Sequence, residues 1–317
     1  MRARDEAGRA QTGHAWADRL DVMSGQPVGR LDLGPLPVSD AVVPPAYYRI
    51  VVAIDGHGFR ECARNLRRGS GTNPIELVVR DGQGSTDGMV QIGGDTLRIP
   101  ADEPLCTNCE RPVEVASFWL DECEVSIGEY RAFLAAHDVS RPWGWEFVPD
   151  DDETNSKPVA YVSWEHARMY AEWVGKRLPT HAEWELAARG SAGRFFPWPG
   201  SEHRGVTRGG IHTVRNDKQA DIVFYLNAVQ PVRSVPDARS VDGVYHLFGN
   251  VSEWTESMVA ETVEGVLKVR DDRRWALGGA WDMEALGEDL RWHENKGMDI
   301  HHSSVRRGFR CARSARP

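Results

Sequence analysis

The chain has 317 residues, 41% of them hydrophobic and 27% charged, which is the composition of an ordinary globular protein with room for two domains. Its formal net charge of −9 argues against nucleic acid as a main partner, and no apolar run approaches the roughly 20 residues that a membrane-spanning helix needs. Five cysteines are too few for a dense disulfide scaffold. Twelve tryptophans suit a fold that buries large aromatic side chains where regular structure is scarce.

The N-terminal quarter of the sequence reads as a polar tail followed by a small β module. Residues 1–27 lack the apolar centre of a signal peptide, so we expect a disordered tail. With no leader and no membrane segment in the sequence, the cytoplasm is the default location. Between residues 28 and 85, β-branched and aromatic runs at 47–54, 59–66 and 75–80 predict strands of a small β-sandwich-like module.

Residues 86–157 contain one predicted hairpin and one predicted helix. Residues 89–99 alternate in the manner of strands and carry Gly93 and Gly94 in the middle, which predicts a β-hairpin that turns there. Ser126 and Glu129 form a capping box, so we expect a helix from there to about His137.

Two further helices follow, and their ends are specified by local residues. Ser163 is a good N-cap for a helix whose apolar residues recur at i, i+3, i+4 and i+7 and which stops at Gly175. Thr180 and Glu183 form a capping box for the next helix, which stops at Gly190. Residues 191–240 are rich in turn formers, and we expect mostly loop there.

Several segments of the chain resemble one known family. They are FWLDECEVSIGEYRAFL (118–134), VSWEHARMYAEWVGKRLPTHAEWELAARG (162–190), FFPW (195–198), GVYHLFGNVSEWTES (243–257), LGGAW (277–281) and GFRCAR (308–313). In this order they resemble the formylglycine-generating enzyme (sulfatase-modifying factor) family over residues 86–317. The resemblance implies an α+β, C-type-lectin-like fold with little regular secondary structure. The preceding module resembles PEGA-type β-sandwiches, which suggests part of a larger kinase-linked or bacterial surface architecture.

The resemblance also implies where copper would bind. In the family's enzymes, two cysteines after the segment at 278–281 bind copper(I) and activate oxygen, which converts a substrate cysteine to formylglycine. Met283 and Glu288 stand at those two positions in this chain. A thioether and a carboxylate do not replace the soft thiolates that copper(I) prefers. We therefore expect the oxidase chemistry to be absent and copper not to bind.

Histidines and cysteines are the other candidate metal ligands in the sequence. A related branch of the family binds iron through three histidines, partly from a His-x-x-x-His helix that this sequence lacks, so His293, His301 and His302 are better explained as surface residues. The cysteines leave three alternatives open, which are a structural zinc site, a disulfide, and free buried thiols as the commonest outcome. Cys106, Cys109 and Cys123 lie within 18 residues of one another and could share a site. Cys311 could join them if the terminal strands pair.

The segment from Gly249 to Trp254 resembles the family's calcium-binding turn. The resemblance implies that Asn250, Val251 and Glu253 supply oxygen ligands to calcium. The alternative is that Asn250 adopts a left-handed turn and Glu253 pairs with an arginine. Arginines that match family positions would fix loops through hydrogen bonds to carbonyl and carboxylate groups, and they are Arg177, Arg189, Arg291 and Arg310.

The residues favour a non-catalytic binding or sensory module, a pseudoenzyme that has kept the scaffold. Its recognition face would be the loops from Ala280 to Val305, with ligand contacts from Trp281, Arg291, Trp292 and His293 and with an unidentified peptide, protein or small molecule as ligand. The alternative is an enzyme, either a formylglycine-generating oxidase or another oxygen-using metalloenzyme with displaced ligands. A third option is a variable ligand-binding surface of the kind found in some lectin-like proteins.

Overall fold

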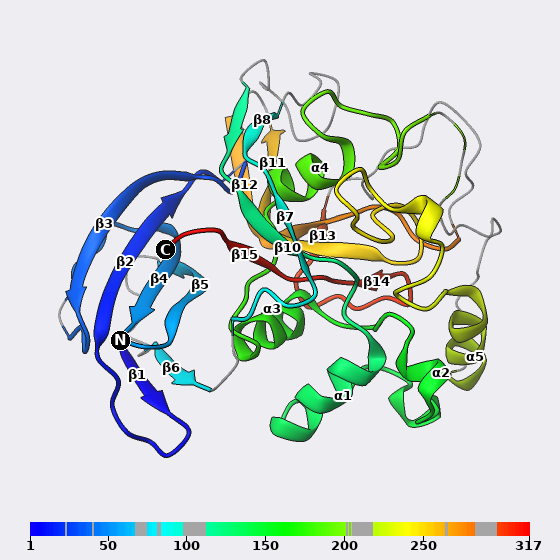
Figure 1. The fold of residues 1–317 in the computed structure, drawn as a ribbon, viewed down its shortest axis with the longest axis horizontal. Coiled ribbons are helices and arrows are strands. Elements are labelled where there is room, and N and C mark those ends of the chain that lie inside the picture. Colours follow the sequence, from blue (N-terminus) through cyan, green and yellow to red (C-terminus); the bar gives the residue numbers. More distant parts are fainter. Residues whose placement is uncertain are drawn as a thin grey trace.

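The computed structural model describes residues 1–22, 24–39, 41–66, 75–80, 84–97, 112–200, 202, 204, 218–263, 266–282 and 297–317. Figure 1 shows two parts side by side: a small all-β module from the N-terminal residues (blue to cyan) and a larger mixed part from the rest of the chain (cyan to red). The C-terminus lies next to the module, because the last strand of the larger part ends there.

The N-terminal module is a small sandwich of two sheets. The larger sheet has the order β3-β2-β4-β5, and the smaller one pairs β1 with β6 in parallel. A buried apolar cluster, including Ala3 from the small sheet and Tyr48 from the large one, joins them. The strands are β1 (Arg2–Asp5), β2 (Gly13–Leu20), β3 (Pro27–Pro35), β4 (Ala46–Ile54), β5 (Gly58–Leu66) and β6 (Glu76–Val79).

The prediction of a disordered tail for residues 1–27 was wrong, because these residues contain strands β1 and β2 and the start of β3. Strand β2 pairs with β3 on one side and with β4 on the other, so it lies inside the sheet. Its buried residues Ala15 and Ala17 are small, and Asp18 is buried because arginines surround it. A strand of this kind buries little apolar side-chain area, so composition alone does not distinguish it from a polar tail.

The described residues of the larger part form three small sheets. Their orders are β15-β10-β7, β13-β12-β11-β14 and β8-β9, and the longest pairing joins β11 and β12 antiparallel. The strands are β7 (Met89–Ile92), β8 (Asp95–Leu97), β9 (Val113–Val115), β10 (Phe118–Asp121), β11 (Ser252–Val263), β12 (Val266–Leu277), β13 (Met298–Asp299), β14 (Arg307–Gly308) and β15 (Ala312–Ser314).

The hairpin expected at residues 89–99 was wrong in its pairing. Strands β7 and β8 do form on either side of Gly93 and Gly94, but they do not pair with each other. Strand β7 pairs with β10, and β8 pairs with β9. The local pattern therefore predicted the strands, whereas more distant segments determined their partners.

The helices lie around these sheets (Figure 1). The α-helices are α1 (Ile127–Ala136), α2 (Asp152–Asn155), α3 (Trp164–Trp173), α4 (His181–Arg189) and α5 (Lys218–Ala228), and the short 3₁₀ helices are η1 (Trp145–Phe147) and η2 (Pro236–Ala238). The capping boxes at Ser126 and Thr180 and the N-cap at Ser163 are all confirmed. Helix α5 lies in the segment for which we expected mostly loop.

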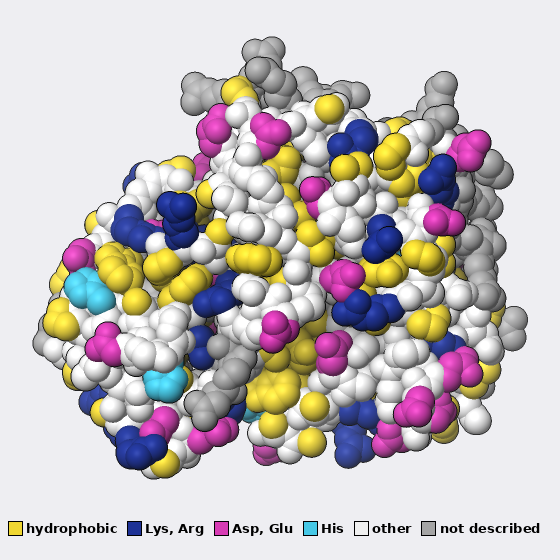
Figure 2. Space-filling model, in the orientation of Figure 1, with side chains coloured by type: hydrophobic (Ala, Val, Ile, Leu, Met, Phe, Trp, Pro, Cys, Tyr) yellow, Lys and Arg dark blue, Asp and Glu magenta, His cyan; other side chains and the backbone are white. Residues whose placement is uncertain are grey.

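Large aromatic side chains fill the core of the larger part. Five tryptophans are almost completely buried, namely Trp184, Trp198, Trp254, Trp275 and Trp281. On the face drawn in Figure 2, acidic and basic side chains are intermixed rather than gathered into a patch of one sign. None of the described helices is long and apolar enough to cross a membrane.

Candidate functional site

The turn at Asn250 is the buried polar centre of the larger part. Asn250 has a φ of 60°, in the left-handed region, which asparagine tolerates better than most residues. Its side-chain oxygen accepts the N–H of Gln230 at 2.9 Å, and its amide nitrogen donates to Glu124 at 2.9 Å. Its carbonyl accepts the N–H of Trp281 at 2.9 Å. The turn therefore fixes the start of the expected recognition face.

Glu253, three residues further on, is held by an arginine. Arg310 donates from two nitrogens to the two carboxylate oxygens of Glu253, each at 2.7 Å, and the Trp184 indole donates to one of them at 2.8 Å. The remaining N–H groups of Arg310 donate to backbone carbonyls of residues 121, 122 and 245. Both side chains are fully buried. Burial opposes the charge on Arg310, but Glu253 outweighs it and raises the pKa of Arg310.

These contacts test whether the turn fits calcium. Asn250 and Glu253 are both bound by protein groups, and the Val251 side chain is buried in the apolar core. Among the described residues, no three His, Cys, Asp or Glu side chains are grouped so that they could hold a metal ion. The side-chain oxygens that the resemblance assigns to calcium thus already accept hydrogen bonds from protein groups. The geometry matches the alternative, a left-handed asparagine and a carboxylate paired with an arginine.

Glu124 is a second buried carboxyl at this centre. One of its oxygens accepts from Asn250, and the other has no hydrogen-bond partner among the described residues. Burial raises the pKa of Glu124 to about 8, with Arg310 acting against burial and Glu253 acting with it. One arginine therefore acts on two buried carboxyl groups, because Arg310 binds Glu253 and opposes the rise in the pKa of Glu124.

The expected recognition face is described only at its two ends, residues 280–282 and 297–305. Trp281 is 2% exposed and its ring lies 5.3 Å from that of Phe224, so it is a core residue rather than a surface contact. Asp282 next to it pairs with Arg306, whose Nε lies 2.5 Å from the carboxylate. The other residues singled out there, Met283, Glu288, Arg291, Trp292 and His293, lie outside the described residues.

The C-terminal end of this face is fixed to the start of α3. The N–H of Tyr161 donates to Ser304, and the N–H of Trp164 donates to Ile300, at 3.0 and 3.1 Å. His301 lies 3.0 Å from the Glu165 carboxylate. His302 contacts Arg307 at 3.2 Å, so the two neighbouring histidines face different partners rather than a shared site.

Aromatic residues that the sequence reasoning missed lie beside this face. Tyr161 has a φ of 57°, which is uncommon for an aromatic residue, and its ring lies 5.0 Å from that of Trp143. Phe224 on α5 is 46% exposed. A signal for α5 was present in the sequence, because Ile222, Tyr225 and Leu226 recur at i, i+3 and i+4.

Three cysteines lie among the described residues, and all are free thiols, namely Cys62, Cys123 and Cys311. Burial raises the pKa of Cys123 to about 12 and raises that of Cys311 as well. Cys106 and Cys109 lie outside the described residues.

Three of the arginines that match family positions fix loops as expected. Arg177 binds the Glu183 carboxylate through two nitrogens at 2.7 Å each, and Arg189 donates to the carbonyl of Arg194 at 3.0 Å. Arg310 binds three carbonyls besides its carboxylate. Arg291 lies outside the described residues.

The sequence and the fold of this chain are similar to those of known proteins. An inactive C-alpha-formylglycine-generating enzyme 2 from Bos taurus is 29% identical over 282 residues, covering 74% of this chain and 90% of that protein. A formylglycine-generating enzyme from Thermomonospora curvata is 30% identical over 232 residues, covering 57% of this chain and 74% of that protein. The crystal structure of CarF superposes with a TM-score of 0.52 at 19% identity, covering 71% of this chain and 97% of that one, which shows a shared fold. The model of the sulfatase-modifying factor enzyme 1-like domain matches residues 74–315, and the chain therefore belongs to the formylglycine-generating enzyme (sulfatase-modifying factor) family, with its α+β, C-type-lectin-like fold.

Proposed function

We propose that this chain is a non-catalytic binding module of its family. The observation that carries the proposal is the residue pair Met283 and Glu288, which stand where the resemblance places the two copper-binding cysteines. Copper(I) is held by soft ligands, above all thiolates, and a carboxylate is a hard one.

The relatives give support to both candidate functions. The Bos taurus relative is called inactive, which supports a scaffold kept for purposes other than oxidation. The Thermomonospora curvata relative is called a formylglycine-generating enzyme, which supports the alternative of an oxygen-using enzyme with displaced ligands. The missing cysteine pair favours the first.

The loops from Ala280 to Val305 form the recognition face in this proposal. Both described ends of this face are hydrogen-bonded to the scaffold, as a binding loop requires. At one end the N–H of Trp281 donates to the carbonyl of Asn250, and at the other the N–H groups of Tyr161 and Trp164 donate to carbonyls of the face. Trp281 serves as an anchor of the loop rather than as a ligand contact, and the ligand contacts proposed from the sequence are Arg291, Trp292 and His293. The ligand is a peptide, a protein or a small molecule. Membership of a larger kinase-linked or surface architecture remains part of the proposal.

Mass spectrometry of a peptide substrate tests this function. A sulfatase-type peptide with the sequence Cys-x-Pro-x-Arg is incubated with the folded protein, copper, oxygen and a thiol reductant, and the Thermomonospora curvata enzyme serves as the positive control. We expect no formylglycine in the peptide. Its formation would refute the proposal and establish the enzymatic alternative.

A gain-of-function variant tests the reason for inactivity. We expect the double variant Met283→Cys/Glu288→Cys to bind copper(I) much more tightly than the wild type, because it restores two thiolates. The matched control is Met283→Ser/Glu288→Ser, which changes the same two positions without adding sulfur. Tight copper(I) binding by the wild-type protein would contradict the lost-site explanation.

A further inference from the structure

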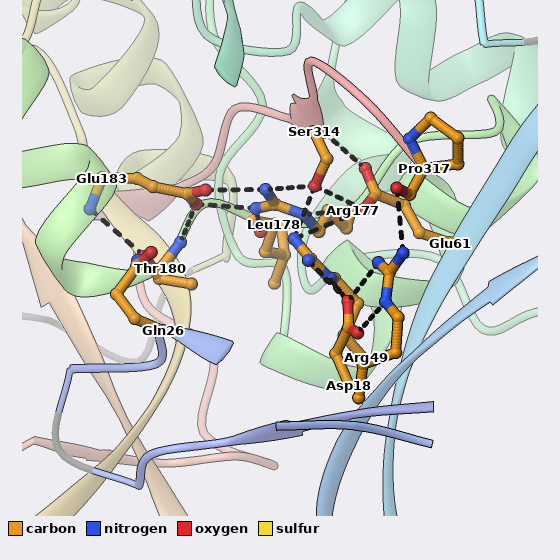
Figure 3. Close-up of polar contacts among 11 residues, drawn as sticks. Asp18, Gln26, Arg49, Glu61, Arg177, Leu178, Thr180, Glu183, Ser314 and Pro317 are labelled. Carbon is orange, nitrogen blue, oxygen red and sulfur yellow. Dashed lines mark hydrogen bonds and ion pairs between the residues drawn. The ribbon is translucent and has the colours of Figure 1, made fainter. Parts of the chain in front are cut away.

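A buried polar seam joins the N-terminal module to the larger part (Figure 3). We use the name seam for the residues at which the two parts meet around Arg177 and Ser314. Six of its charged residues form a connected set of ion pairs. These six residues are Asp18, Arg30, Arg49 and Glu61 from the module and Arg177 and Glu183 from the larger part.

Glu61 on β5 is the centre of the seam. Its two carboxylate oxygens accept the backbone N–H and the hydroxyl of Ser314, at 2.7 and 2.8 Å, and the Nε of Arg177 lies 3.3 Å from one of them. The Glu61 side chain is completely buried and the Arg177 side chain is 4% exposed. Burial acts to raise the pKa of Glu61, but Arg177 and Arg49 outweigh it and lower the pKa. Glu61 is therefore ionised, and its partners lie across the seam.

The other charges extend this pairing into a network. Arg49 on β4 donates to Asp18 at 2.7 Å and to the hydroxyl of Ser314 at 2.5 Å, so it links the module to the last strand. Arg30 on β3 binds Asp18 through two nitrogens and also donates to the carbonyl of Pro317 at 3.1 Å. On the side of the larger part, Arg177 is already held by Glu183.

Apolar packing closes the seam beside the charges. Leu20, Tyr47 and Ala63 from the module form a buried cluster with Met258 from β11. The Tyr47 hydroxyl donates to Glu256 on the same strand. The cavity at this place measures only about 10 Å³, which is room for a single water molecule. The apolar contacts and the hydrogen bond of Tyr47 therefore add to the ion pairs that hold the two parts together.

A second ion pair fastens the module away from the seam. Arg64 at the far end of β5 binds Glu172 of α3 through two nitrogens, at 2.6 and 3.1 Å. A hinge motion of the module would have to break this pair together with the bonds of Glu61 and Arg49. Polar interfaces between domains usually permit motion, but here the completely buried Glu61 pairs with Arg177 across the boundary, and Arg64 pairs with Glu172 across it as well.

We infer that the surface around Arg177 and Ser314 is a permanent docking surface for the N-terminal sheet, and that the two parts unfold as one cooperative unit. It does not depend on the proposed binding function.

Tryptophan provides a separate probe for each part. Trp16 is the only tryptophan in residues 1–85, and Trp184 is fully buried in the larger part. The full-length protein is labelled with 5-fluorotryptophan, and the two ¹⁹F resonances are assigned from Trp16→Phe and Trp184→Phe. Urea unfolding is then followed at both resonances. We expect the same midpoint for the two probes in the wild type.

Glu61→Ala tests whether the seam creates this cooperativity. We expect the urea midpoint of Trp16 to fall below that of Trp184 in this variant, because the module loses its carboxylate bonds to Ser314 and Arg177. Glu6→Ala is the matched control, because Glu6 is a module carboxylate whose partner, Arg80 at 3.1 Å, lies in the module as well. If Glu61→Ala does not fold, Glu61→Gln is measured in the same way. Separate midpoints in the wild type, or a shift for Glu61→Ala no larger than for Glu6→Ala, would overturn the inference.

Discussion

Replacing Arg310 by methionine should be one of the most damaging single substitutions in the larger part. The change leaves the Trp184 indole as the side-chain donor to the buried Glu253 carboxylate among the described residues, and it removes the side-chain donor from three backbone carbonyls. Removing one partner of a buried ion pair typically costs 3–5 kcal/mol, so we expect a loss of about 4 kcal/mol in the free energy of unfolding. At about 2.1 cal/mol/K of unfolding entropy per residue, this corresponds to a fall in Tm of roughly 6 °C if the chain unfolds as one unit.

Urea denaturation followed by tryptophan fluorescence, together with calorimetry, measures this loss. The double variant Glu253→Gln/Arg310→Met should lose less than the two single variants added together, because it leaves no unpaired carboxylate at this position. The control is Arg270→Met, which removes a half-exposed arginine from an ion pair with Asp272 on the surface and should change stability far less. A loss below about 1 kcal/mol for Arg310→Met would refute the argument that this pair organises the core.

Three further predictions concern other parts of the molecule. Gly297→Ala should destabilise the protein by about 1–3 kcal/mol in a urea titration, because the φ of Gly297 is +65° and a Cβ there would lie 2.0 Å from a methyl carbon of Val259. The control is Gly93→Ala, which should be nearly neutral because the space around Gly93 is open. The ionised Glu61 contributes stability that is complete above its ordinary pKa of 4.5 and is lost as the pH falls through its lower pKa in the folded protein. Glu61→Gln should therefore flatten the fall of the free energy of unfolding with decreasing pH, and an unchanged slope below pH 4.5 would contradict this. Calcium or EDTA should leave Tm unchanged, and a rise with calcium that Glu253→Gln abolishes would show that the turn binds the metal after all.

The helix caps could be read from the sequence because they are local. Ser126 and Thr180 bind groups three residues away, so the residue types at fixed spacing suffice to predict the helix starts. The strand partners could not be read in this way. Strand β7 pairs with β10, more than 20 residues further on, and nothing in the sequence of β7 selects that partner over β8.

The candidate site was predictable to a similar degree. The resemblance located the turn at Asn250 and the segment after Trp281, and a carboxylate–arginine pair at Glu253 was among the alternatives. The sequence could not show that Arg310, 57 residues away, is the partner. It also could not show that Trp281 points into the core, because a tryptophan beside charged residues is compatible with either a buried or an exposed position.

The position of β6 affects how fragments of this protein should be designed. The family model begins at residue 74, and an expression fragment cut there would keep β6 (Glu76–Val79) but discard β1, the strand with which it pairs. The same cut would uncover Met258 and leave Ser314 without the carboxylate that binds its amide. Such a fragment would present an unpaired strand edge and a freshly exposed apolar patch, both of which favour aggregation. The family match therefore begins at residue 74, whereas a fragment that keeps these contacts must also include the N-terminal module.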